Sequence, residues 1–243
     1  MQQHEKDTYH AAPYDALAQD YDQGLEKLLG VFGGNNEKYA EYKVELLRRL
    51  LPGKICSILD FGCGTGRSLS FFRKHFSLSL SLSLSLSGCD ISRESLKIAS
   101  QRDPEAQIFL CTSVEELKTH EKQYDLVFLS CVLHHMEPGI RDEWMGALAE
   151  KLVPGGHLAV FEHNLKNPCT RRIVHDPENS EDNPEFMMTP AEVSALLSRA
   201  GIRREWSGYT LFSPFRRPWV TSLERYLAWC PLGAQFCVMG TRE

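Results

Sequence analysis

The chain of 243 residues lacks three features that would point to particular classes of protein. No apolar run approaches the ~18 residues of a membrane-spanning helix, and the polar segment 1–10 lacks the pattern of a secretory signal. Lysine and arginine number 27 against 32 acidic residues, a formal net charge of −5, which argues against a broad electrostatic grip on nucleic acid. We therefore expect neither insertion into a membrane nor a nucleic-acid partner.

The eight cysteines include no C-x-x-C pair. Most of them lie in or beside segments that we predict as core strands, where a free cysteine behaves as a small apolar residue. This pattern predicts a reducing, cytoplasmic location and not a disulfide framework. With 42% apolar residues, the chain can bury one substantial α/β core.

Residues 58–67 have the sequence I-L-D-F-G-C-G-T-G-R, an apolar run that ends in Asp60 and continues with three glycines at alternate positions. Glycines at these positions remove Cβ atoms where a ligand approaches the main chain and where a positive φ is needed. The pattern predicts a strand that turns sharply into a helix. The free N–H groups and positive dipole end of that helix suit an anionic or carboxylate group.

The glycine spacing separates two classes of ligand. Dinucleotide-binding proteins use G-x-G-x-x-G, so that a pyrophosphate fits over the start of the helix. Here the spacing is G-x-G-x-G, and Asp60 stands two residues before the first glycine. Because an acid at that place would repel a pyrophosphate and attract an ammonium group, a nicotinamide-dependent oxidoreductase is the less favoured alternative.

The motif D-x-G-x-G-x-G resembles the first motif of class I S-adenosylmethionine-dependent methyltransferases. Further segments match this family in the same order: an acid after the second strand, a third strand over 106–111, a Y-D-L-V segment that leads to L-H-H, and a P-G-G turn before the fifth strand. The segments 162–174 and 231–236 resemble an uncharacterised bacterial branch of the class. The matching residues of the first motif are Asp60, Gly62, Gly64 and Gly66.

The resemblance implies an α/β fold with a Rossmann-like, seven-stranded, mostly parallel sheet, helices on both faces and an antiparallel last strand. It also implies an amino-terminal helical lid, for which we expect residues 1–53, and a methyltransferase core over residues 54–243. From local patterns we expect a Ser-Leu tract at 77–87 that is part loop and part second strand, and an irregular segment over 163–188. We further expect an extra helix over 218–229.

The family binds S-adenosylmethionine and releases S-adenosylhomocysteine, and several of its binding positions can be carried over. Asp60 would receive the amino group of the methionine, and Asp90 would accept the two ribose hydroxyls. Ser113 stands where the family commonly has the acid that accepts from adenine, which is a departure, and Val114 would cover the adenine face. The cofactor-binding residues that we expect are Asp60, Phe61, Gly62, Cys63, Gly64, Gly66, Asp90, Ile91, Ser113, Val114, Ser130, Cys131, Lys43 and Tyr21.

Three histidines follow neighbouring central strands, at the edge where an open α/β sheet keeps its ligand site. A histidine, with an unperturbed pKa near ~6.5, can take a proton from an acceptor hydroxyl or protonated amine. We expect His135 to be the base, followed by His163, Glu162 and His134, and the alternative is that they only shape the pocket. Because no acid is spaced with them as a ligand set, we expect no metal site.

The same reasoning leaves the acceptor open. Candidate substrate-binding residues are Tyr39, Asn164, Arg171 and Arg172, although the tyrosine could simply pack and the arginines could simply be solvated. We predict methyl transfer from S-adenosylmethionine to oxygen, nitrogen or carbon of a small metabolite or of a glycan or lipid precursor. The alternative of another class is a non-catalytic, S-adenosylmethionine-binding regulatory protein.

Overall fold

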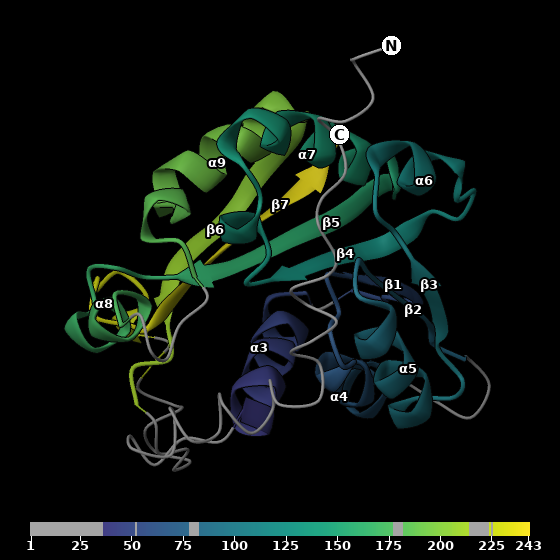
Figure 1. The fold of residues 1–243 in the computed structure, drawn as a ribbon, viewed down its shortest axis with the longest axis horizontal. Coiled ribbons are helices and arrows are strands. Elements are labelled where there is room, and N and C mark those ends of the chain that lie inside the picture. Colours follow the sequence, from purple (N-terminus) through teal and green to yellow (C-terminus); the bar gives the residue numbers. More distant parts are fainter. Residues whose placement is uncertain (1–35, 52, 78–82, 177–181, 214–223, 225) are drawn as a thin grey trace.

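A seven-stranded sheet forms the centre of the protein (Figure 1). The computed structural model describes residues 36–51, 53–77, 83–176, 182–213, 224 and 226–243. The strand order is β3-β2-β1-β4-β5-β7-β6, in which β1 to β5 pair in parallel and β7 runs antiparallel to both β5 and β6. The strands are β1 Ser57–Phe61, β2 Ser85–Asp90, β3 Gln107–Leu110, β4 Tyr124–Ser130, β5 Leu152–His163, β6 Ile202–Thr210 and β7 Gln235–Arg242. The predicted Rossmann-like sheet with an antiparallel last strand is confirmed.

Helices cover both faces of this sheet, as predicted (Figure 1). One face carries α3, α4 and α5, and the other carries α6, α7 and α9, while α8 lies at the edge of the molecule. Each face has its own apolar core, one around Phe72 and Phe128 and the other around Trp144 and Leu148. The helices are α3 Asn36–Leu50, α4 Arg67–Phe76, α5 Arg93–Arg102, α6 Val114–Thr119, α7 Arg141–Glu150, α8 Pro168–Val174 and α9 Pro190–Arg199, with short 3-10 turns η1 Leu133–His135, η2 Pro138–Ile140 and η3 Pro184–Phe186.

Local sequence sets the ends of several elements. α9 begins in a capping box, in which Thr189 and Glu192 each bond the backbone N–H of the other. The expectation of an irregular segment over 163–188 was wrong, because α8 and η3 lie within it. Asn167 caps α8 by accepting from the N–H groups of two residues in its first turn, and Pro168 starts the helix with a preset φ.

The structure describes the Ser-Leu tract and the helix expected over 218–229 only in part. β2 takes up the carboxyl end of the Ser-Leu tract from Ser85, while residues 78–82 lie outside the described residues. The fifth strand keeps regular register with β4 from His157 onward, after the turn at Gly155, whose φ is 76°. Most of the helix expected over 218–229 also lies outside the described residues.

Of the predicted lid over 1–53, the structure describes α3 and the few residues that follow it. Val44 and Leu47 of α3 are fully buried in the core shared with α4. α3 is thus packed as part of the main body, whereas residues 1–35 lie outside the described part. The lid and its boundary at residue 53 stay predictions.

The strand order reverses between β1 and β4, so their carboxyl ends lie side by side at one edge of the sheet. In an open α/β sheet this switch point is the place where ligands bind. The other ends of the two strands are held together by Asp125, whose carboxylate accepts from the N–H groups of Cys56 and Ser57 at 2.7 and 2.8 Å. The fold therefore brings the glycine turn after β1 and the histidine segment after β4 to one place.

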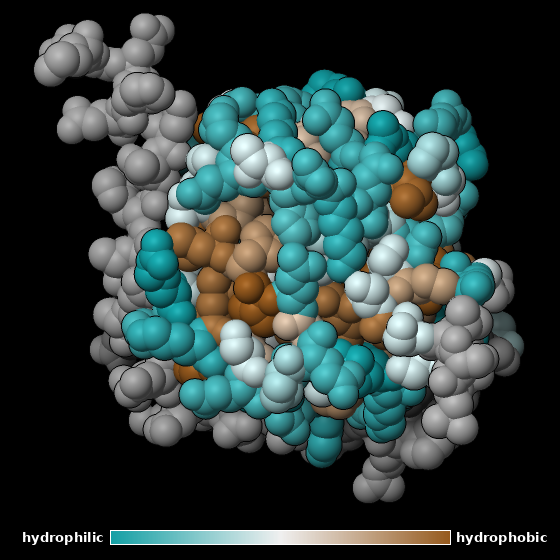
Figure 2. Space-filling view, turned by 90° about the vertical axis from the view of Figure 1, so that its right-hand side faces the viewer, coloured by the Kyte–Doolittle hydropathy of each residue, from teal (hydrophilic) through white to brown (hydrophobic). Residues whose placement is uncertain are grey.

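The surface on the right of Figure 1 is the side on which the edge strand β3 lies. In Figure 2 apolar residues form a band across this side, framed by hydrophilic residues. The residues of β3 are partly exposed, as expected for a strand that has only one neighbour. None of the helices in the described part of the chain is long and apolar enough to cross a bilayer.

Replacing Phe72 by alanine tests the core beneath the sheet. Its fully buried ring lies 5.1 Å from the ring of Phe128, so its removal should lower the free energy of unfolding by about 3–5 kcal/mol. The neighbouring Phe71 is only partly buried, and Phe71→Ala should cost less than about 2 kcal/mol. Urea denaturation measures both; equal losses would contradict this account of the core.

Candidate active site

The glycine turn after β1 is held against the end of β2. The N–H groups of Gly62 and Cys63 both donate to the carbonyl of Cys89, at 2.9 and 3.0 Å. The N–H of Gly64 donates to a carboxylate oxygen of Asp90 at 2.8 Å. Asp90, predicted to bind ribose, therefore lies beside the glycine turn and is already oriented by it.

All three motif glycines have positive φ, at 71°, 51° and 76° in chain order. A Cβ on Gly62 would lie 2.5 Å from a methyl group of Val132, and a Cβ on Gly66 would lie 2.9 Å from the Cβ of Ala99. A Cβ on Gly64 would meet nothing within 4 Å among the described atoms. The outer glycines are thus required by packing, while the space over the middle glycine is open to a ligand.

Asp60, in the last part of β1, is a buried carboxyl group with 2% of its surface exposed. Its Oδ2 atom has no hydrogen-bond partner among the residues that the structure describes. Burial raises the pKa of Asp60 to about 8, with a further increase from Asp90 and a decrease from Lys43. A buried acceptor without a donor is costly, so this oxygen suits a ligand that brings a donor with a positive charge.

Lys43 reaches this edge from α3, and its side chain is buried. Its Nζ donates to the hydroxyl of Ser130 at 2.6 Å and lies 3.9 Å from the thiol of Cys131. The sequence placed Lys43, Ser130 and Cys131 near the ligand, and the structure brings all three together at the carboxyl end of β4. A buried ammonium here offers a partner for an anionic group.

Cys131 has a φ of 60°, which is unusual for a residue other than glycine. The side-chain amide of Gln235 donates to its sulfur at 3.0 Å, and Oε1 of the same amide has no partner in the described part of the chain. Burial raises the pKa of the Cys131 thiol, but His163 and Lys43 outweigh that effect and lower the pKa to about 7. A strained, polarised thiol thus lies where β4 ends.

Glu162 is the central fixed group of the histidine cluster, and only 1% of its surface is exposed. One carboxylate oxygen accepts from the N–H groups of Val132 and Leu133, at 3.1 and 2.8 Å. The other oxygen lies 2.5 Å from Nδ1 of His134. Burial favours the neutral acid, but His134 outweighs burial and lowers the pKa of Glu162. Glu162 therefore holds η1 and the ring of His134 in place.

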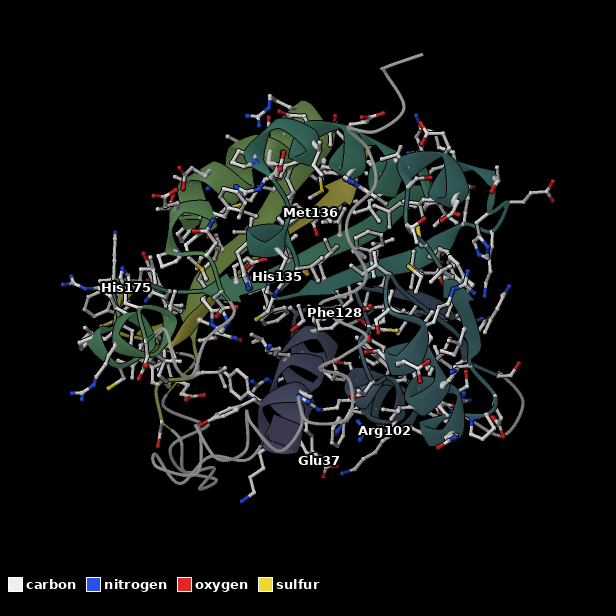
Figure 3. The ribbon with its side chains drawn as sticks, in the orientation of Figure 1. Glu37, Arg102, Phe128, His135, Met136 and His175 are labelled. Carbon is white, nitrogen blue, oxygen red and sulfur yellow. The ribbon has the colours of Figure 1, made fainter. Side chains whose placement is uncertain are left out.

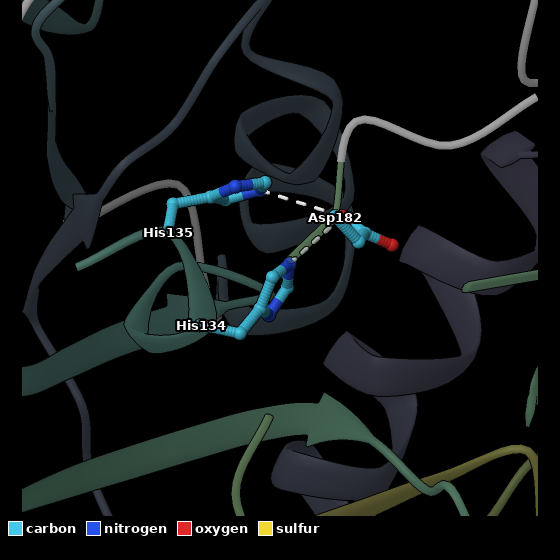
Figure 4. A group of neighbouring side chains, drawn as sticks. All are labelled: His134, His135 and Asp182. Atoms are coloured by element: carbon cyan, nitrogen blue, oxygen red, sulfur yellow. Dashed lines mark hydrogen bonds and ion pairs between the residues drawn. The ribbon is translucent and has the colours of Figure 1, made fainter. Parts of the chain in front are cut away.

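The three histidines converge on Asp182, which comes from the segment before η3. Figure 4 shows two of them, His134 and His135, together with Asp182. Nε2 of His134 and of His135 lie 3.1 and 3.8 Å from Oδ1 of Asp182. Nε2 of His163 lies 3.7 Å from Oδ2. Figure 3 shows His135 near the middle of the molecule, over the carboxyl end of the central strands.

The surroundings shift the pKa values of these groups in opposite directions. Burial and the neighbouring His134 lower the pKa of His135 to about 4. Burial opposes charge on His134 as well, but Glu162 and Asp182 raise its pKa above the ordinary value. Burial favours the neutral acid of Asp182, yet the histidines hold its pKa below the usual range. At neutral pH the cluster thus contains a neutral His135 beside charged partners.

The remaining predicted cofactor residues lie around the same edge. Phe61 is buried beneath the turn, with its ring 5.3 Å from the ring of Trp144, and Ile91 is half-buried after β2. The hydroxyl of Ser113 accepts from the N–H of Glu116 as the N-cap of α6, and Val114 is buried in the core. Tyr21 lies outside the described residues.

The predicted substrate residues do not gather at the histidines. The buried amide of Asn164 donates to the carbonyls of Pro231 and Gly233, so it ties two loops together and does not point toward a ligand. Arg171 and Arg172 are exposed on α8, which Figure 1 shows at the edge of the molecule. Tyr39 is partly buried on α3, packed against the core. Arg171 and Arg172 line a surface pocket together with Lys166 and His175, and a role of these residues in binding the acceptor stays a prediction.

Sequence reasoning missed two members of the site. Asp182 contacts all three histidines but stands in a polar segment without any motif, so no local signal could have identified it. Gln235 lies within segment 231–236, whose sequence resembles a bacterial branch of the class. Only its contact with Cys131 shows that it belongs to the site. Both depend on long-range packing.

Comparison with known proteins agrees with the geometry. The family described as "Methyltransferase domain" matches residues 59–158. A dTDP-4-amino-2,3,4,6-tetradeoxy-D-glucose N,N-dimethyltransferase from Saccharopolyspora spinosa is 26% identical over 202 residues, which are 67% of this chain and 77% of that protein. An uncharacterized protein from Synechococcus is 33% identical over 109 residues, which are 43% of this chain but only 24% of that protein.

Solved structures show the same fold. The plantazolicin methyltransferase BpumL, in complex with SAH, matches with a TM-score of 0.62 and 20% identity, over 95% of this chain and 91% of that one. A SAM-dependent methyltransferase from Archaeoglobus fulgidus matches with a TM-score of 0.62 and 17% identity, over 91% and 99% of the two chains. The chain thus has the fold of these S-adenosylmethionine-dependent methyltransferases, and its residues 59–158 match the methyltransferase-domain family.

Proposed function

We propose that the protein transfers a methyl group from S-adenosylmethionine to a small-molecule acceptor. The observation that carries this proposal is the buried Oδ2 of Asp60, which has no partner among the described residues and belongs to the last part of β1, directly before the glycine turn with its open space over Gly64. The amino acid part of S-adenosylmethionine brings an ammonium group that can donate to such an oxygen. A pyrophosphate would bring only acceptors and negative charge.

The other residues of this edge fit the remaining parts of the cofactor. Asp90 would accept from the ribose hydroxyls after release of part of its present contacts, and Lys43 would pair with the cofactor carboxylate. Ser113 and Val114 follow β3 and would border the adenine. S-adenosylmethionine supplies an activated methyl group on a sulfonium, so the residues of this chain have mainly to orient the acceptor and exclude water.

The predicted acid–base roles gain different support from the structure. Glu162 is bound to backbone N–H groups and to His134, which suits it to positioning and not to direct proton transfer. His135 is neutral at pH 7, since its pKa is lowered to about 4, and its side chain is 21% exposed. His163 remains an alternative base, with its pKa raised by Cys131 against the effect of burial.

We also propose a cytoplasmic location. All eight cysteines are free thiols, including the buried Cys63, Cys89 and Cys237. Buried apolar cysteines without disulfides are typical of proteins that work in a reducing compartment. The acceptor that we propose is a small molecule, in keeping with the formal net charge of −5.

Calorimetry with S-adenosylmethionine and S-adenosylhomocysteine tests the cofactor, and release of S-adenosylhomocysteine in the presence of small hydroxyl and amino compounds tests the transfer. We expect each of the two compounds to bind with a stoichiometry of one. Binding of neither to a folded sample would overturn the proposal. Binding without turnover on any acceptor would favour the regulatory alternative.

Two alanine substitutions distinguish a glycine that is needed for packing from a glycine that leaves room for the ligand. Both Gly62→Ala and Gly64→Ala carry a left-handed backbone cost of about 1–2 kcal/mol, since φ is 71° and 51°. Gly62→Ala should add an overpacking cost of about 1–3 kcal/mol through its clash with Val132. Gly64→Ala should instead weaken S-adenosylmethionine binding at least about tenfold. Thermal melting and calorimetry measure the two effects, and equal stability losses without any effect on binding would contradict the assignment.

Asp60 predicts a pH dependence of cofactor binding. In the free protein the raised pKa of about 8 keeps this carboxyl largely protonated at pH 6, whereas an ammonium partner requires the carboxylate. Binding therefore releases one proton, and affinity should rise about tenfold per pH unit as the pH increases from about 5 toward 8. Calorimetry in buffers of different ionisation enthalpy measures the proton directly. Asp60→Asn should bind weakly and without this dependence; a wild-type slope in that variant would contradict the role of Asp60.

For the free protein the same pKa predicts the opposite trend in stability. The folded state holds the Asp60 proton up to about pH 8, whereas the unfolded chain loses it near pH ~3.9. This contribution to stability is therefore complete below the unfolded pKa and is lost as the pH rises toward 8. Chemical denaturation of wild type and Asp60→Asn at several pH values should show the loss in wild type only.

A further inference from the structure

Imidazole nitrogens and a carboxylate oxygen from separate parts of the chain meet at the end of β4. We propose that His134, His135 and Asp182 bind one divalent transition-metal ion through two Nε2 atoms and Oδ1. The two histidines come from η1 and the aspartate from the segment before η3, and Figure 4 shows all three side chains turned toward one another. Their ligand atoms lie within 4.8 Å of one another.

The separations suit a metal centre. Zinc binds histidine nitrogen and carboxylate oxygen at about 2.0–2.2 Å, so two ligands of one tetrahedral ion lie roughly 3.3 Å apart. Oδ1 of Asp182 lies 3.1 Å from Nε2 of His134 and 3.8 Å from Nε2 of His135. An ion between these atoms therefore needs only small rotations of side chains.

His134 also has the second partner that metal-binding histidines use. Its Nδ1 faces a carboxylate oxygen of Glu162 at 2.5 Å, and the other oxygen of Glu162 is fixed by the N–H groups of Val132 and Leu133. A carboxylate that accepts from one ring nitrogen fixes the ring so that the other nitrogen faces the ion. Because Glu162 is buried and anchored to the backbone, Nε2 of His134 is presented toward Asp182 by a rigid part of the fold.

The donor set selects the kind of ion. Two imidazoles and one carboxylate suit zinc, iron, cobalt or nickel, whereas magnesium and calcium prefer oxygen ligands throughout. Three protein ligands also leave a coordination position for water or for another oxygen or nitrogen donor. His163 contacts the other oxygen of the same aspartate, with its Nε2 3.7 Å from Oδ2 of Asp182.

A second cluster of comparable composition lies between α3 and α4 and contains Glu41, Glu45 and His75. Here Glu41 already pairs with the ammonium of Lys74 at 2.7 Å, and no residue of the cluster is buried. A lysine competes with a metal for that carboxylate. This cluster therefore serves as the matched control for the site at His134.

The proposed metal site lies close to the proposed site of methyl transfer. Val132, directly before η1, forms the wall against which Gly62 packs, so the proposed ion lies on the same edge as the cofactor turn. An acceptor atom that binds the open position would be held at this edge, and His135 would act as a ligand and not as a base. That role rests on the proposed function, whereas binding of the ion does not.

Cobalt(II) and zinc(II) added to chelator-treated full-length protein test the proposal. Cobalt in a site with imidazole ligands gives visible absorption bands, and calorimetry with zinc gives the affinity. We expect one equivalent of each metal to bind. Glu162→Gln should lower the affinity about 10–100-fold, and His135→Ala or Asp182→Asn, which remove a ligand, should lower it at least as much. The control His75→Ala should bind as wild type does.

Absence of metal binding to the wild type would overturn the proposal, as would wild-type affinity in Asp182→Asn or loss of binding in His75→Ala. Asp182→Asn and His135→Ala change side chains that are not part of the apolar core, so they keep the test valid if His134→Ala does not fold. Calorimetry with S-adenosylmethionine in the presence of chelator distinguishes the two proposals. If the protein binds S-adenosylmethionine but no metal, the metal site is contradicted and the proposed function is not.

Discussion

The parallel pairing of β1 with β4 is the constraint on which the site depends. Asp125 fixes the start of the pair through two backbone N–H groups, and the register aligns Phe61 with Leu129 near its end. Because both strands end at the same edge, the glycine turn and the histidine segment face one another. The close approach of Gly62 to Val132 is the direct result. Any residue with a Cβ at that glycine would push the two loops apart.

Several buried ionisable side chains gather at this edge, although others, such as Arg141 and Lys151, are buried elsewhere in the fold. Asp60, Lys43 and Glu162 are each at least nine-tenths buried, although burial of an ionised group is costly without a partner. Glu162 is satisfied by two N–H groups and His134, and Lys43 by Ser130. Asp60 keeps an oxygen without a partner among the described residues. An acid whose pKa is raised in this way is well suited to ionise when a cationic ligand binds.

The sequence was most informative where chemistry and local backbone geometry coincide. The three alternate glycines predicted positive φ in the turn, and all three have it. The pattern Thr189-x-x-Glu192 is that of a capping box, and α9 starts there. The sequence was least informative for polar loops. The segment after β5 has no apolar periodicity that would predict α8. The helix depends on its cap at Asn167 and on the hydrogen bonds of Asn167 and Asn164 to the loop before β7.

By itself, the sequence determined the sheet class, the glycine turn and the set of histidines at the ends of neighbouring strands, because short patterns encode backbone conformation and burial. Only the tertiary structure decided the partners of those histidines. Asp182 lies 48 residues after His134 along the chain, and Gln235 lies 104 residues after Cys131. No periodicity or spacing in the sequence links residues so far apart. Their contacts form only when the strands pair in their order and the loops pack at the carboxyl ends of the strands.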